Sequence, residues 1–220
     1  MTSSTRGRTF RSVSRRSRDA VDARTRLAFH EAGHAVLSAA INDAPRVVSI
    51  RPLGNTLGRS GQRMLARPSV LVQLHVAGFA AEHLLTRRRP RQFDQELGFA
   101  ILSRDDPELR LAFEGSHERD GYRAVREVLR MAALHTDDEI RREVEWFYDV
   151  ARASLAAVWS AVRGVANALL EHEELDRDGV FDAIGGSDVY GAVLRVQESH
   201  GLRERSPSRR LTSTRNRRRK

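Results

Sequence analysis

The feature that most constrains this chain is a pair of histidines inside an apolar, helix-patterned segment. Apolar residues recur at helical spacing from about 22 to 42, and Asn42-Asp43-Ala44-Pro45 then breaks the pattern. His30 and His34 stand four residues apart in this segment, so a helix places both imidazoles on one face. The apolar flanks predict that this helix is buried.

Two imidazoles one helical turn apart can converge on one zinc ion, whose nitrogen ligands lie at about 2.0–2.1 Å. Glu31 follows the first histidine and completes a His-Glu-x-x-His pattern. In this pattern the glutamate takes a proton from metal-bound water and passes it to a leaving amine. Gly33 costs roughly 1 kcal/mol of helix propensity relative to alanine, so we expect it to relieve a close contact. The alternative is a histidine pair that holds no metal.

A catalytic zinc site needs a third protein ligand and an open fourth position. The chain has no cysteine, so the third ligand must supply nitrogen or oxygen. Residues 37–40 read Leu-Ser-Ala-Ala, which excludes the longer motif whose third histidine follows on the same segment. Spacing alone leaves these downstream donors open: Glu82, His83, Asp94, Asp105, Asp106, His117, Glu118, Asp120 and His135.

The remaining pattern predicts a mainly α protein with a small β element. Helices are expected over 69–86, 95–103, 107–113, 117–135, 138–171 and 176–184. Thr136-Asp137-Asp138 can cap the long helix, and Gly185-Gly186 ends the last one. A short strand over 47–50 stops at Pro52, and the glycines from 54 to 61 indicate a loop or a second, irregular strand.

The basic character of the chain belongs to its ends. The formal net charge is +9, and residues 1–20 carry +5 while residues 201–220 carry +8, which leaves about −4 for the rest. Both ends have few apolar residues to bury, so we expect disorder there and any nucleic-acid contact only through these tails. The predicted division is a basic tail (1–21), a domain (22–185), a C-terminal extension (186–202) and a second basic tail (203–220).

Composition also excludes some functions and locations. Lys220 is the single lysine, so a P-loop ATPase site has no candidate. The longest uncharged apolar stretch of the middle, 69–81, has 13 residues, short of the ~20 that a membrane span needs. No apolar run follows Arg15-Arg16, as a secretion signal would require. We therefore expect a cytoplasmic protein without a membrane span.

The segment His-Glu-Ala-Gly-His-Ala-Val at 30–36 resembles the zinc helix of the peptidase domain of FtsH-type proteases. Other segments are similar to that family in the same order, and together they cover about residues 22–185. They are the strand and loop at 50–58, the Gly/Ala-rich helix at 77–82, the Asp120–Ala124 segment, and Leu169–Asp176, which is similar to the C-terminal boundary of the family's domain.

The resemblance implies an FtsH-peptidase-like helical domain that hydrolyses peptide bonds with zinc. It assigns these residues: His30, His34 and Asp120 as zinc ligands and Glu31 as the base. His117, Glu118 and Asp106 remain rivals for the third place, because three extra residues separate Asp120 from the Gly115-Ser116 pair.

Two departures from the family bear on function. The family has an apolar strand that pairs with substrate, and the polar segment Arg59–Arg63 stands in its place here. If this segment pairs with substrate through its backbone, its side chains shift the substrate preference toward acidic or polar peptides. The alternative is that it is a solvated loop. Its hexameric ATPase and membrane helices have no counterpart in this sequence. We therefore expect ATP-independent cleavage of unstructured polypeptides, or delivery of substrate by a separate ATPase or adaptor.

The alternative is a non-catalytic zinc-binding interaction or regulatory module of the same fold, with tail-mediated nucleic-acid contact. The complete motif favours an enzyme, because a structural zinc site has no use for Glu31. The oligomeric state stays open at this point.

Overall fold

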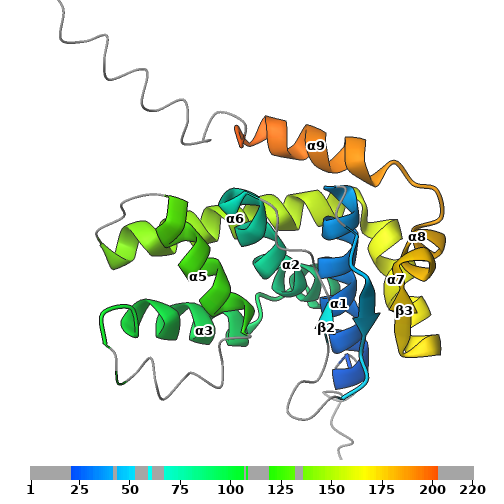
Figure 1. Cartoon of the computed structure of the whole chain (residues 1–220), viewed down its shortest axis with the longest axis horizontal. Helices are drawn as coiled ribbons and strands as arrows, with labels where there is room; N and C mark the ends of the chain where they lie inside the picture. The colour runs from blue at the N-terminus through cyan, green and yellow to red at the C-terminus, as the bar shows by residue number, and fades with distance from the viewer. Residues whose placement is uncertain are drawn as a thin grey trace, which may run out of the picture.

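The computed structural model describes residues 21–41, 44–52, 59–60, 67–106, 108, 119–131 and 136–202. Within these residues the protein is mainly α, with eight helices and one small antiparallel sheet (Figure 1). This confirms the predicted class. The helices are α1 (Ala23–Ala40), α2 (Pro68–Thr86), α3 (Arg91–Leu102), α5 (Asp120–Met131), α6 (Asp137–Ala157), α7 (Trp159–His172), α8 (Arg177–Ile184) and α9 (Val189–Ser199).

The central pair of the fold is α1 packed against α2. Asp22 caps α1 by accepting a hydrogen bond from the Thr25 backbone N–H at 2.9 Å. A Cβ at Gly33 would lie 2.6 Å from the Ala77 carbonyl oxygen and 2.7 Å from Ala81 Cβ, so only glycine lets the two helices approach this closely. The expected close contact at Gly33 is confirmed.

Other helices cover this pair on different sides. In Figure 1, α3 and α5 lie on one side of α1 and α2, while α7 and α8 lie on the other. Contacts from α2 reach α5 and α6, and contacts from α1 reach α7. One apolar cluster runs through all of these elements, so α1 is held in the interior of the molecule.

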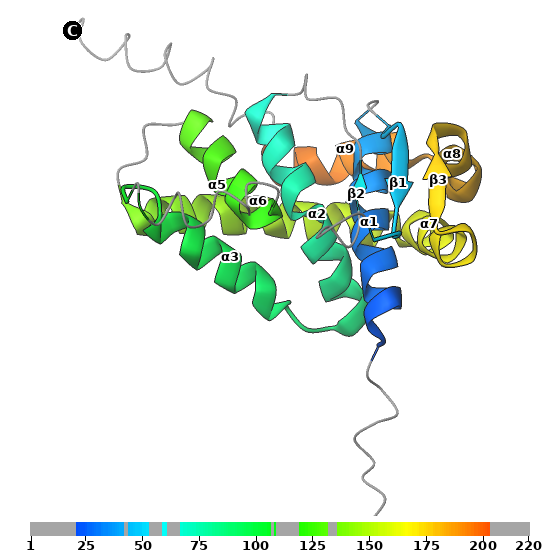
Figure 2. The ribbon, with the colours of Figure 1, turned by 60° about the horizontal axis from the view of Figure 1, so that its bottom comes forward.

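The small sheet lies beside α1 and is three strands wide (Figure 2). Its order is β2 (Arg59–Ser60), β1 (Val47–Ser49) and β3 (Glu174–Asp176), and both pairings are antiparallel. In the register, Val48 stands opposite Ser60 on one side and Leu175 on the other. The predicted first strand is confirmed and the irregular second strand is present, whereas β3 was not predicted.

The predicted continuous helix over 138–171 is wrong. The chain forms α6 and α7, which are bent by 84° at Val158. Val158 has φ −120° and ψ 29°, outside the helical region, and its side chain stays buried. The bend lets α7 turn toward α1 and α8. No single helix in the described ranges is long and apolar enough to cross a membrane; only the bent α6–α7 pair reaches that length and composition together.

The remaining predictions differ from the structure mostly at helix ends. The helix expected at 95–103 begins at Arg91. The one expected at 117–135 begins at Asp120 and is described as far as Met131, while 117–118 and 132–135 lie outside the described residues. The predicted stop of α8 is confirmed: the helix ends at Ile184, and Gly185 caps it with φ 71°. The helix α9 was not predicted; it packs on α6 and α1, and its Gln197 Nε2 donates to Gln73 Oε1 at 3.0 Å. Apart from residue 108, the expected 107–113 helix lies outside the described residues, as do the tails at 1–20 and 203–220.

Candidate metal centre

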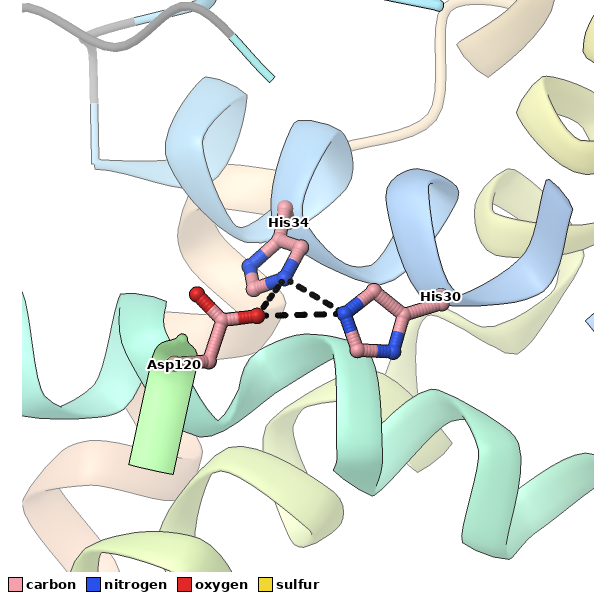
Figure 3. Close-up of side chains that lie close together, drawn as sticks. All are labelled: His30, His34 and Asp120. Carbon is pink, nitrogen blue, oxygen red and sulfur yellow. Dashed lines mark hydrogen bonds and ion pairs between the residues drawn. The ribbon is translucent and has the colours of Figure 1, made fainter. Parts of the chain in front are cut away.

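Three side chains from two helices point toward one another (Figure 3). His30 and His34 come from α1, and Asp120 is the first residue of α5. The two histidine Nε2 atoms are 3.1 Å apart, and Asp120 Oδ2 lies 3.1 Å from His30 Nε2 and 3.0 Å from His34 Nε2. Among the described residues, this is the one group of histidine and carboxylate side chains that could hold a metal ion.

The helix α2 forms the wall behind His30. A Cβ added at Gly78 would overlap the His30 ring, so glycine supplies the space that the imidazole occupies. Phe79 on the next position meets the same ring edge to face, with centroids 5.2 Å apart. The ring is therefore fixed by packing as well as by its polar contacts.

The outward nitrogens of both histidines have acceptors. His30 Nδ1 lies 2.8 Å from Glu82 Oε1, and Arg26 Nη2 donates to the other Glu82 oxygen at 3.1 Å. His34 Nδ1 lies 2.7 Å from the Leu74 carbonyl oxygen. A carbonyl oxygen only accepts, so the proton of a neutral His34 sits on Nδ1 and its Nε2 lone pair faces inward. The Glu82 carboxylate likewise keeps the proton of a neutral His30 on Nδ1, so that the Nε2 lone pair of this ring also faces inward.

This arrangement fits a metal ion. Metal binding requires both imidazoles in their neutral form, and the inward atoms are then two nitrogen lone pairs and a carboxylate oxygen. Their separations of 3.0–3.1 Å are close to the ~3.3 Å between ligand atoms of a tetrahedral zinc site with bonds of about 2.0–2.1 Å. Two imidazoles and one carboxylate are a ligand set that zinc accepts with one position left open.

The electrostatics of the centre favour positive charge. Burial alone would raise the pKa of Asp120, but His34 and His30 beside it hold that pKa well below the usual carboxyl range. Burial alone would lower the pKa of His30, but the Asp120 and Glu82 carboxylates raise it well above its usual value. The centre therefore stabilises a cation among its three inward atoms.

Glu31 lies beside this cluster on α1 and is only 6% exposed. Burial raises its pKa above the usual carboxyl value, while the nearby histidines act in the opposite direction. Buried carboxyl groups with raised pKa values are the type of side chain that serves as a general base in enzymes.

Among the described residues, none of the other predicted donors joins the cluster. His117, Glu118 and His135 lie outside the described residues. Those that the structure describes have different partners: Glu82 binds His30 Nδ1, His83 binds Tyr148 Oη at 2.9 Å, Asp94 pairs with Arg89 at 2.8 Å, Asp105 with Arg104 at 2.6 Å, and Asp106 accepts the Glu108 N–H at 2.9 Å.

Sequence reasoning missed several residues around the centre. The Leu74 contact is made by backbone, which leaves no trace in a sequence, and Glu96, a buried residue behind α5, carried no motif. His75 follows Leu74 in an apolar run; it is 4% exposed, and burial lowers its pKa to about 4, so it is neutral at pH 7. Within the part of the chain that the structure describes, its Nε2 has no hydrogen-bond partner.

Comparisons with known proteins identify no relative. A scan of the sequence against protein-family models gives no match, and a search of curated proteins gives none either. The assignment of a function to this centre therefore depends on its own residues and their geometry.

Proposed function

We propose that the protein is a zinc-dependent metallopeptidase of the FtsH peptidase type, acting on unstructured or partner-delivered polypeptides. The observation that carries the proposal is the convergence of His30, His34 and Asp120 within 3.1 Å of one another, with Glu31 next to the first of them. The resemblance of residues 30–36 to the zinc helix of that family supports the same assignment.

Each residue then has a defined role. His30, His34 and Asp120 would hold the ion, which would supply Lewis-acid activation of the attacking water and of the peptide carbonyl. Glu31 accepts the proton of the attacking water on its carboxylate and returns it to the amine leaving group. Glu82 keeps the His30 ring in the tautomer that presents Nε2 to the centre.

The sheet offers a place for an extended substrate. In the order β2-β1-β3, β2 is an edge strand within the described residues. An extended peptide can add to such an edge through backbone hydrogen bonds, whatever its side chains are. Contacts of α1 with both β1 and β2 place this edge on the helix that carries the histidines. This supports cleavage of unfolded chain segments.

The proposal is tested by the cleavage of casein, an unstructured substrate, with zinc-loaded protein. We expect the wild type to cleave it and Glu31→Gln to be at least about 100-fold slower while retaining zinc, because the base is lost and the ligands are not. Glu171→Gln, an exposed glutamate on α7, is the matched control and should cleave like the wild type. If zinc binds and neither wild type nor variant cleaves, the protein is the non-catalytic zinc module instead.

A further inference from the structure

Behind the third ligand lies a buried carboxylate that belongs to another helix. Glu96 of α3 is 6% exposed and sits against the start of α5. Its Oε2 accepts the backbone N–H of Gly121 at 3.0 Å, and its Oε1 accepts from Gln92 Nε2 at 2.9 Å. Each carboxylate oxygen of Glu96 therefore accepts one hydrogen bond, and the two bonds fix the orientation of the carboxylate.

The approach of the two helices is too close for any side chain at position 121. A Cβ built on Gly121 would lie 2.6 Å from Glu96 Cβ and 3.3 Å from the Glu96 carbonyl carbon. Neither of these atoms is the flexible end of a side chain, so a larger residue would push the helices apart. The Glu96–Gly121 contact thus sets how α5 sits on α3.

The contact acts on the peptide unit that follows Asp120. The first N–H groups of a helix have no partner within the helix, so an acceptor from outside satisfies them and fixes the helix start. Here Glu96 supplies that acceptor, one residue after the side chain that faces His30 and His34. Metal–ligand distances in a well-formed site lie within about 0.2 Å of their standard values, so the position of α5 bears directly on metal binding.

We propose that Glu96 is a positioning residue for the metal centre, holding Asp120 in place through the Gly121 backbone N–H. The inference rests on the proposed metal site and adds a residue that touches neither the ion nor the substrate. It predicts that the loss of the Glu96 acceptor weakens metal binding more than it weakens the fold.

The test is zinc affinity, measured by competition with a chromophoric chelator. We expect Glu96→Ala to bind zinc about 10- to 100-fold more weakly, the usual cost of losing a residue that orients a ligand. Glu96→Gln keeps an oxygen that can accept the Gly121 N–H, so it should stay within about 3-fold of the wild type. Gln95→Ala removes an exposed neighbour on the same helix and should change nothing.

Two further measurements separate positioning from a loss of folding. The Co²⁺ form of Glu96→Ala should lose the strong visible absorption of a tetrahedral site, while its urea unfolding in EDTA stays cooperative. Gly121→Ala, which displaces the same contact, should weaken zinc binding in the same way.

If the wild type binds zinc and Glu96→Ala binds it equally well, this inference is wrong. If the wild type binds no zinc, the proposed site itself is wrong and the inference falls with it.

Discussion

His30 and His34 each use one ring nitrogen toward the centre and the other toward a fixed acceptor. For His30 that acceptor is the Glu82 carboxylate at 2.8 Å, and for His34 it is the Leu74 carbonyl at 2.7 Å. These outer bonds decide which nitrogen carries a lone pair toward Asp120. At the scale of residues, metal affinity should therefore depend on side chains that never touch the ion.

The first residue-scale prediction concerns Glu82. The substitution Glu82→Ala removes the acceptor of His30 Nδ1. It also removes the ion-pair partner of Arg26. We expect zinc affinity to fall about 10- to 100-fold, because the ring is then free to rotate or to change tautomer. Isothermal titration with zinc measures this, with Glu171→Ala as the exposed control. Unchanged affinity in Glu82→Ala would show that packing alone orients His30.

The second concerns the space behind the His30 ring. Gly78→Ala places a methyl group where the ring now lies, so His30 must move and zinc binding should be lost. Gly98→Ala is the matched helical control, because its Cβ meets only an Arg141 nitrogen at 4.0 Å. That control should keep zinc affinity and raise the free energy of unfolding by about 0.5–1 kcal/mol. Equal zinc binding by both variants would contradict this account of the ring.

The residues of the centre differ in how far they could be predicted. His30, Glu31 and His34 were identified because a helix alone fixes their relative positions. Asp120 lies 90 residues from His30, so spacing left it among several donors and only the resemblance singled it out. Glu82 was among those donors, but its contact with the outer nitrogen depends on how α2 packs against α1.

At the scale of elements, periodicity located most helices and missed what packing decides. The bend at Val158 escaped prediction because the apolar stripe continues through it, and Leu155, Val158 and Val162 are all buried. The strand β3 has three residues, too few for a period, and it exists because it pairs with β1. Local signals were more reliable at the start of α6, where the predicted cap is confirmed.

That cap gives an element-scale prediction. Thr136 accepts the Glu139 N–H at 3.2 Å, and Glu139 accepts the Thr136 N–H at 3.0 Å. Thr136→Ala should lower the free energy of unfolding by about 1 kcal/mol and leave zinc affinity unchanged, because α6 supplies no ligand. Urea unfolding and zinc titration of one variant check both parts. A loss of zinc affinity would mean that the start of α6 is coupled to the centre.

At the scale of the whole molecule, the centre joins parts of the chain that are distant in sequence. Its candidate ligands come from α1 and α5, and the residues that hold those ligands in place come from α2 and α3. Zinc held there should stabilise the native state, by about 2.7 kcal/mol at a free concentration 100 times the Kd. Urea unfolding with zinc and with EDTA measures this increment, and His34→Ala should abolish it. An increment that survives in His34→Ala would mean that zinc binds elsewhere.

The most direct measurement is anomalous X-ray diffraction at the zinc absorption edge, from crystals of the protein grown with one equivalent of zinc. The account predicts one strong peak at about 2.0–2.2 Å from His30 Nε2, His34 Nε2 and an Asp120 carboxylate oxygen. A folded protein with no peak at these three residues, or with its zinc bound at other side chains, would contradict the central claim.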